Sequence, residues 1–330
     1  MVIARRGLLL GAAALALPAL GGCRQRDGKV RIGFIVKQPE EQWFQNEWKY
    51  AGQAARDRGF TLIRIGAADG DRVLTAIDNL AAKDAKGFVI CAPDPRLGTA
   101  IQERARVNDL KVMSVDDRLI GPRGQPIESI PHVGISARAI GRMAGAAALD
   151  EARRRGWPIG EIGVLRLAYD SLETARERTF GAREALIAGG LPAANIVDAP
   201  QRTTDTEGGF TAASPVLTRH PDLRHWIIVG LNDETVLGGV RAAEGLSLGA
   251  EAVIGVGIGG SGTADAEFRK AEATGFFGSV LLSPRRHGYD TTSAMFDWIT
   301  KGKRPAPVTL TSGEMMTRAN FRQLLAAEAA

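Results

Sequence analysis

The sequence contains few of the residues that build disulfide or metal centres. Among its 330 residues are two cysteines and four histidines. If Cys23 is modified, Cys91 is the only remaining thiol and no internal disulfide can form. No two histidines have the spacing of a metal site on one helical face, so we expect them at the surface or behind a binding site. They are His132, His220, His225 and His287. We therefore expect no bound metal, no cofactor, and a fold that depends on its hydrophobic core.

The sequence also lacks a strong charge of either sign and a membrane-spanning run beyond its first 23 residues. Without residues 1–22 the chain keeps 40 basic and 37 acidic side chains, a net charge of +3. A charge this small argues against a nucleic-acid partner. The apolar runs after residue 23 are too short to cross a bilayer.

Residues 1–23 have the pattern of an export leader and not of a folded element. Arg5 and Arg6 precede an apolar segment over residues 8–20, which is too short to span a bilayer comfortably. The segment ends in Leu20-Gly21-Gly22-Cys23, which is similar to the lipobox of bacterial lipoproteins. We expect export to the periplasm, with Cys23 lipidated. An ordinary cleaved leader, with Cys23 incidental, is the alternative, and the two arginines loosely resemble a twin-arginine signal.

The mature sequence alternates strand-like and helix-like segments. Short apolar runs between helices are typical of parallel strands buried on both faces. The expected strands are 30–36, 60–65, 87–91, 111–115, 162–167, a short one near 196, 225–230, 252–258 and 278–282. The expected helices are 43–58, 72–83, 98–107, 137–155, 174–188, 210–219, 232–244, 263–273 and 284–300. A Gly/Pro-rich segment at 121–126 separates two cycles, which predicts two doubly wound α/β lobes.

Polar residues gather where the expected strands end. Lys37 and Glu41 follow the first strand, Asp116 and Asp117 the fourth, and Asn232 the strand that ends at Gly230. Parallel strands present their carboxyl ends at one edge of the sheet, where open α/β folds bind ligands. Two such edges facing each other would enclose a cleft.

The turn after the first strand has the chemistry of a sugar site. It combines the cation Lys37, the anion Glu41 and the neighbouring aromatics Trp43 and Phe44. Charged groups bond hydroxyls strongly, and an aromatic ring covers an apolar sugar face. A solvated helix start with Trp43 in the core would explain the same residues. Likewise, Asp116-Asp117 could cap a helix and Arg178 could lie on a helix surface.

Five motifs resemble the type I periplasmic sugar-binding proteins, specifically their arabinose-binding members. The similarity extends from about Val30 to beyond Tyr289. The motifs are Lys37–Phe44, Gly87–Pro95, Val115–Asp117, Leu172–Thr179 and Trp226–Arg241.

The resemblance implies two doubly wound parallel-sheet lobes joined by three crossovers, which close on one monosaccharide. The N-terminal lobe would be residues 29–135 plus 283–310, and the C-terminal lobe residues 136–282 plus 311–330. The crossovers would lie near 134–136, 282–283 and 310–311. The chain would be a monomeric receptor that delivers L-arabinose to the permease of an ABC importer.

The resemblance also implies which residues meet the sugar. Those that would hydrogen-bond it are Lys37, Glu41, Asp116, Asp117, Arg178 and Asn232. Trp43 and Phe44 would contact its apolar faces. The residues that would line or support the pocket are Cys91, Ile135, Leu172, Thr174 and Leu231.

The sequence departs from the family at three of these positions. Gly259 stands where the family has a sugar-binding asparagine, and one extra residue precedes the next helix. Ser261 or water could replace that asparagine. Ile135 and Leu231 stand where relatives carry methionine, which changes the pocket wall. Galactose, fucose or another aldose therefore stay open beside arabinose.

Other functions fit the sequence less well. Asp116 and Asp117 are adjacent, so in extended backbone they point to opposite sides and cannot flank one glycosidic bond. Gly255-x-Gly257-x-x-Gly260 matches a dinucleotide fingerprint, but its first two glycines fall inside an expected strand. A transcription regulator would need a helix-turn-helix where this chain has a leader. A lipid-tethered sensor for an aldose, signalling to a receptor kinase, is the alternative to import.

Overall fold

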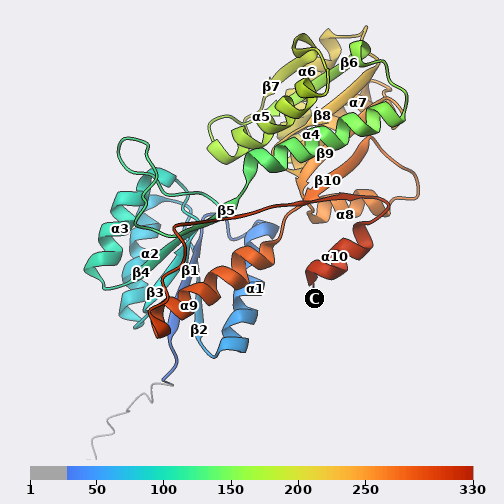
Figure 1. Cartoon of the computed structure of the whole chain (residues 1–330). Helices are drawn as coiled ribbons and strands as arrows, with labels where there is room; N and C mark the ends of the chain where they lie inside the picture. Colours follow the sequence, from blue (N-terminus) through green and yellow to red (C-terminus); the bar gives the residue numbers. More distant parts are fainter. Residues whose placement is uncertain (1–27, 330) are drawn as a thin grey trace, which may run out of the picture.

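In the computed structural model, which describes residues 28–329, the chain forms two α/β lobes side by side (Figure 1). Each lobe is built on a six-stranded sheet with helices packed on both faces. We call the lobe with sheet order β11-β5-β4-β3-β1-β2 the N-terminal lobe, and the lobe with order β12-β10-β9-β8-β6-β7 the C-terminal lobe.

The N-terminal lobe consists mainly of the first third of the chain. Its elements from that part are β1 (Arg31–Val36), α1 (Gln42–Arg58), β2 (Thr61–Gly66), α2 (Gly70–Ala82), β3 (Gly87–Ile90), the 3₁₀ turn η1 (Pro95–Leu97), α3 (Gly98–Val107), β4 (Lys111–Val115) and β5 (His132–Ile135). A later excursion adds the π-helical turn η4 (Arg286–Asp290), α9 (Thr291–Lys301) and β11 (Val308–Thr311). The chain therefore leaves this sheet and returns to it.

The C-terminal lobe repeats the same strand order with the middle of the chain. Its elements are α4 (Ala137–Arg154), η2 (Ile159–Glu161), β6 (Ile162–Ala168), α5 (Glu173–Ala188), η3 (Ala193–Asn195), β7 (Ile196–Pro200), α6 (Thr206–Arg219), β8 (His225–Val229), α7 (Asp233–Gly245), β9 (Val253–Gly259), α8 (Gly262–Arg269), β10 (Phe276–Leu281), β12 (Glu314–Thr317) and α10 (Phe321–Ala329). The chain passes from one sheet to the other after β5, after β10 and after β11.

The apolar strands form these sheets because both faces of each sheet are covered. Ile32, Phe34, Ile227 and Ile254 are fully buried, as expected for continuous apolar runs in parallel strands. All the strand pairings are parallel except β10 with β12, which is antiparallel. The expectation of parallel-sheet lobes is thus confirmed, with one antiparallel edge strand.

Several expected boundaries were wrong. The helix expected over 210–219 begins at Thr206, because the Asp205 side chain accepts a bond from the amide of Gly208 and caps it. The helix expected over 263–273 ends at Arg269. Strands β5, β11 and β12 were not expected, because strands of only four residues carry too weak a pattern. No helix among residues 28–329 is long and apolar enough to cross a membrane.

Candidate functional site

The polar residues singled out in the sequence lie where strands of both sheets end. In the N-terminal lobe, Lys37 follows β1, Cys91 follows β3, and Asp116 and Asp117 follow β4. In the C-terminal lobe, the β6–α5 and β8–α7 connections lead into Thr174 and Asn232. These two edges are in contact, because the Thr174 hydroxyl donates a 3.1 Å hydrogen bond to Asp117 Oδ1.

Asp117 is the centre of this contact. Its Oδ2 accepts a 2.7 Å hydrogen bond from Lys37 Nζ and lies 3.8 Å from Cys91 Sγ. The residue is 6% exposed. Burial lowers the pKa of Lys37, but the neighbouring Cys91 and Asp117 raise it above its ordinary value. Burial also raises the pKa of the Cys91 thiol, so the thiol is uncharged and Asp117 is the effective partner of Lys37.

Asp116 points away from Asp117 and into the N-terminal lobe. Its backbone is left-handed (φ 61°), and no helix follows β4 directly, so the helix-cap interpretation of this pair was wrong. Asp116 Oδ1 accepts a 3.3 Å hydrogen bond from Trp43 Nε1. Asp116 Oδ2 is buried and has no hydrogen-bond partner among the described residues.

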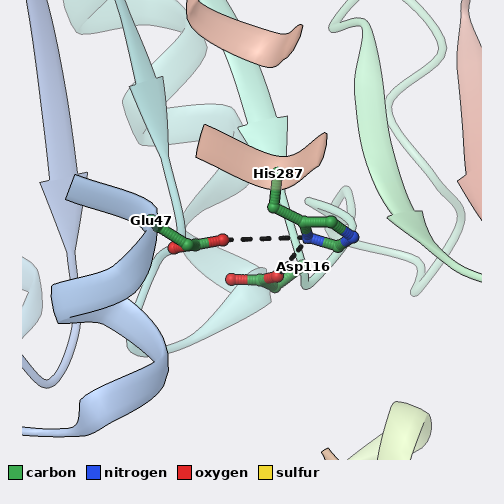
Figure 2. Close-up of side chains that lie close together, drawn as sticks. All are labelled: Glu47, Asp116 and His287. Atoms are coloured by element: carbon green, nitrogen blue, oxygen red, sulfur yellow. Dashed lines mark hydrogen bonds and ion pairs between the residues drawn. The ribbon is translucent and has the colours of Figure 1, made fainter. Parts of the chain in front are cut away.

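Asp116 belongs to a cluster of three side chains that we call the proton cluster, which consists of Glu47, Asp116 and His287 (Figure 2). His287 Nδ1 lies 2.7 Å from Asp116 Oδ1 and 3.7 Å from Glu47 Oε1. Thr311 uses its hydroxyl proton on the Gly134 carbonyl, so it accepts a bond from His287 Nε2. Because Nε2 donates its proton to Thr311, a neutral imidazole would present only a lone pair at Nδ1. The 2.7 Å contact between Nδ1 and Asp116 Oδ1 therefore requires a further proton between these two atoms.

The donor types of the proton cluster also suit a divalent metal ion. Two ligands each about 2.1 Å from one ion would lie about 3 Å or more apart. The 2.7 Å contact between His287 and Asp116 is shorter than that and is typical of a hydrogen bond. A shared proton therefore fits the geometry better than a metal ion.

The pKa values of the two carboxyl groups of the proton cluster move in opposite directions. Burial, and then the charge of Asp116, raise the pKa of Glu47 well above its ordinary value. Burial acts on Asp116 in the same direction, but the hydrogen bond and charge of His287 outweigh it and lower the pKa. Glu47 is thus the neutral acid and Asp116 the anion.

Arg178 reaches the same region from helix α5 of the C-terminal lobe. Its Nη1 donates a 2.7 Å bond to the Leu231 carbonyl, while its buried Nε has no partner among the described residues. Burial lowers the pKa of Arg178, and the nearby Asp117 and Asp116 oppose that shift. The surface-helix interpretation was therefore wrong, because Arg178 points toward the other lobe's carboxylates.

Asn232 has a structural role that the sequence did not reveal. Its Oδ1 accepts from the Thr235 amide at 3.0 Å, which makes it the N-cap of α7, and its Nδ2 donates to the Thr204 carbonyl at 2.8 Å. One N–H and one oxygen lone pair remain for a ligand.

The segment around Gly259 packs closely against Asp233. Gly259 ends β9 at φ 137°, a conformation that favours glycine, and a Cβ there would lie 3.2 Å from Asp233 Oδ2. Asp233 is fully buried and accepts bonds from Ser279 and from the Ser261 amide. Burial, and then Glu234, raise the pKa of Asp233 to about 6. The Ser261 hydroxyl donates to Glu234 Oε1 at 2.7 Å, so it is already used within the protein.

The remaining predicted residues divide into those at the contact of the lobes and those in a core. Trp43 packs against apolar clusters of both lobes, and Glu41 lies near Lys37 and near Glu234 of the other lobe. Burial raises the pKa of Glu41, and the charge of Lys37 opposes this rise only in part. The others are more enclosed: Phe44 is 3% exposed in the N-terminal core, Ile135 and Leu231 are buried, and Leu172 is half-buried before α5. Cys23 lies outside the described residues.

Sequence reasoning missed Glu47 and did not recognise the position of His287, and it placed Asp233 only among the polar residues at a strand end. His132 and His287 are both buried, so the surface alternative was wrong for these two histidines. Glu47 sits among apolar residues on the buried face of α1, an unusual position for a carboxylate. That periodicity was the one signal available before the structure was known.

Comparison with known proteins gives concordant results. The profile of the family described as periplasmic binding proteins and sugar-binding domain of the LacI family matches residues 29–319. The chain is 49% identical to an ABC transporter L-arabinose-binding periplasmic protein from Azospirillum brasilense, over 96% of this chain and 95% of the relative. It is 45% identical to the L-arabinose-binding periplasmic protein of Escherichia coli K12, over 95% of each chain.

Solved structures share the fold at lower sequence identity. A periplasmic ribose ABC transporter protein from Conexibacter woesei superposes with a TM-score of 0.75 and is 22% identical, over 91% of this chain and 95% of that one. This likeness supports the fold of two α/β lobes.

Proposed function

The chain belongs to the family of periplasmic binding proteins and LacI-type sugar-binding domains, and from this premise we propose that it captures L-arabinose between its lobes for an ABC importer. The observation that carries the proposal is the meeting of side chains from both lobes at Asp117, with unpartnered polar atoms beside it. Lys37 and Asp117 come from the N-terminal lobe, and Thr174 from the C-terminal lobe.

The donors and acceptors at this contact suit a neutral sugar. Asp117 and Asp116 only accept, whereas Lys37 and Arg178 only donate, so together they can serve hydroxyl and ring oxygens of one molecule. The buried Arg178 Nε has no partner among the described residues, and a sugar would supply one. Each bond to a charged group contributes about 1.5–3 kcal/mol, so a few of them with Trp43 packing support a Kd of about 1 μM or tighter.

The mechanism is closure driven by the ligand. A sugar that touches Asp117 and Arg178 at once binds best when the lobes are together, so it shifts the population toward that state. The Thr174–Asp117 bond is one contact that the closed state gains without ligand. The closed shape is what the permease would recognise.

The finer parts of the proposal follow the names of the relatives. Both relatives are named as periplasmic binding proteins, and the one from Azospirillum brasilense as part of an ABC transporter, so we propose a periplasmic receptor that returns its sugar unchanged. That it acts as a monomer is a further part of our proposal. Nothing in those names supports the sensor alternative. For Cys23 we propose lipidation, which mass spectrometry of the membrane fraction would test by the mass of one N-terminal diacylglycerol group.

A panel of aldoses tests the proposal directly. Thermal shift should show the largest stabilisation with L-arabinose, because a ligand selective for the native state raises its Tm. Calorimetry should then give one site per chain, and NMR of the sugar after incubation should show it unaltered. If galactose or fucose gives the larger shift, the identity of the sugar changes, and if no aldose raises the Tm, the proposal is wrong.

A further inference from the structure

A second cavity lies on the C-terminal lobe, beside the contact of the lobes. It occupies about 290 Å³ at the carboxyl ends of β6 and β7. Its polar lining comprises Arg166, Tyr169, Asp170, Ser171, Asp198 and Gln201. This volume is at the lower end of the range for small-molecule pockets, roughly 300–1,000 Å³.

The first sign of a ligand in this cavity is Gln201. The residue is 8% exposed, yet neither its Nε2 nor its Oε1 has a hydrogen-bond partner among the described residues. Its backbone amide is fixed by a 2.9 Å bond to the Ala168 carbonyl, which holds the residue at the end of β6. Both atoms are enclosed, and an enclosed amide without partners is costly, so a ligand that draws this side chain into the cavity would gain a group that can both donate and accept.

The second observation is that Arg166 has no capacity left for an anion. The residue is 3% exposed, and its five N–H groups are used by Asp198 (Nε and Nη2, both 2.7 Å), Asp170 (Nη1 and Nη2, both 2.9 Å) and Thr179 (Nη1, 3.0 Å). Arg166 with its two aspartates has a net charge of −1. This cluster by itself therefore disfavours an anion, although the charge of Arg183 also acts on Asp198.

The same two aspartates supply the acceptors. Their side chains are 41% and 54% exposed, so the lone pairs that Arg166 does not use are accessible. Hydroxyl groups of a ligand could donate to these carboxylates and exchange bonds with Gln201. Tyr169 is half-buried and offers a ring to an apolar face.

We propose that this cavity is a second, weaker binding site for a neutral polyhydroxylated molecule such as an aldose. It is separate from the contact of the lobes but close to it, because Ser171 directly precedes Leu172 and Thr179 directly follows Arg178. With carboxylates that are half exposed, the affinity is expected to be millimolar. The inference rests on the cavity's own chemistry and does not require arabinose at the other site.

Amide NMR of the full chain carrying Asp117→Ala, which disables the first site, tests the inference. Titration with L-arabinose, D-galactose or glycerol should give saturating shifts clustered at residues 168–171 and 198–201. Adding Gln201→Leu should weaken the binding at least tenfold, whereas the matched Gln102→Leu, at a half-buried position of α3, should not. If Gln201→Leu fails to fold, Ser171→Phe, at an exposed position, should block the cavity instead.

Three outcomes would overturn the second site. They are shifts that rise linearly without saturation, shifts that survive both Gln201→Leu and Ser171→Phe, and stronger binding of ethanolamine than of glycerol. Calorimetry of Gln201→Leu without the Asp117 change should give unaltered arabinose affinity at the first site. Failure of the second site is thus distinguishable from failure of the proposed function.

Discussion

The two lobes have the same strand order but differ in what they bring to their contact. The N-terminal lobe supplies the carboxyl groups of Glu41 and Asp117, with Lys37 as their cation. The C-terminal lobe supplies the buried cation Arg178 and the amide of Asn232.

This difference teaches that neither lobe is a complete site. Acceptors predominate on one side and donors on the other, so a sugar that needs both is satisfied only when the lobes meet. Helices pack closely in both lobes, and in the N-terminal lobe a Cβ at Gly288 would lie 2.2 Å from the Glu47 carbonyl oxygen of α1. In the C-terminal lobe a Cβ at Gly141 of α4 would lie 1.8 Å from the Arg178 carbonyl oxygen of α5. The backbone of Arg178 is thus set by helix packing, whereas Asp117 is set by a loop after β4.

Removing the central acceptor should have the largest effect. Asp117→Ala deletes the partner of Lys37 and of Thr174, and at about 1.5–3 kcal/mol per charged bond we expect at least 100-fold weaker arabinose binding by calorimetry. Asp94→Ala is the matched control, because Asp94 is 38% exposed and pairs with Arg96. Near wild-type affinity in Asp117→Ala would remove Asp117 from the site.

Two buried groups, Asp233 in the C-terminal lobe and His132 in the N-terminal lobe, should respond oppositely to pH. Asp233 has its pKa raised from 3.8 to about 6, so its contribution to stability is full below pH 4 and is lost as the pH rises through 6. Burial lowers the pKa of His132 in the N-terminal lobe from 6.5 to about 4, so the unfolded chain binds more protons and stability rises with pH over that window.

Replacing Asp233 should reveal the pH dependence of stability that comes from His132. In Asp233→Asn the free energy of unfolding should rise more steeply between pH 4 and 6.5 than in the wild type, by up to about 3 kcal/mol at roughly 1.4 kcal/mol per pKa unit. Urea unfolding at intervals across this range measures it. Parallel curves for the two proteins would show that Asp233 titrates normally.

The next largest effect on binding should come from Trp43, which packs against apolar clusters of both lobes. Trp43→Ala removes packing on both apolar clusters and the bond to Asp116, and we expect arabinose binding to weaken about 10–100-fold, or about 1.4–2.7 kcal/mol. Trp298→Ala, in half-buried α9 of the N-terminal lobe, should lower stability and leave affinity intact. Equal affinity losses in the two variants would mean a general effect on folding.

The smallest effect on binding should come from the helix pair that holds Arg178. Gly141→Ala forces α4 and α5 apart, because the new Cβ would overlap the Arg178 carbonyl, at a cost of about 1–3 kcal/mol of stability and a few-fold loss of affinity. Gly245→Ala meets nothing within 4 Å and should leave stability unchanged or raise it by up to about 1 kcal/mol. Thermal melts with and without arabinose separate the two effects.

Much of the architecture was readable from the chain because periodicity is a local property. The apolar run of β1 and the amphipathic pattern of α1 were predicted to within one residue. The four-residue strands β5, β11 and β12 were not predicted, since four residues that gain stability only from a neighbour carry no distinct pattern.

The sequence by itself determined two sets of parallel strands, with charged residues at their carboxyl ends. Only the tertiary structure decided how those charges pair: Lys37 with Asp117, and Asp116 with His287, which is 171 residues away in the chain. The sequence says where a carboxyl group or an imidazole stands in the chain, but not its protonation state. Whether one holds a proton depends on burial and on neighbours within a few ångströms, and those neighbours exist only after folding.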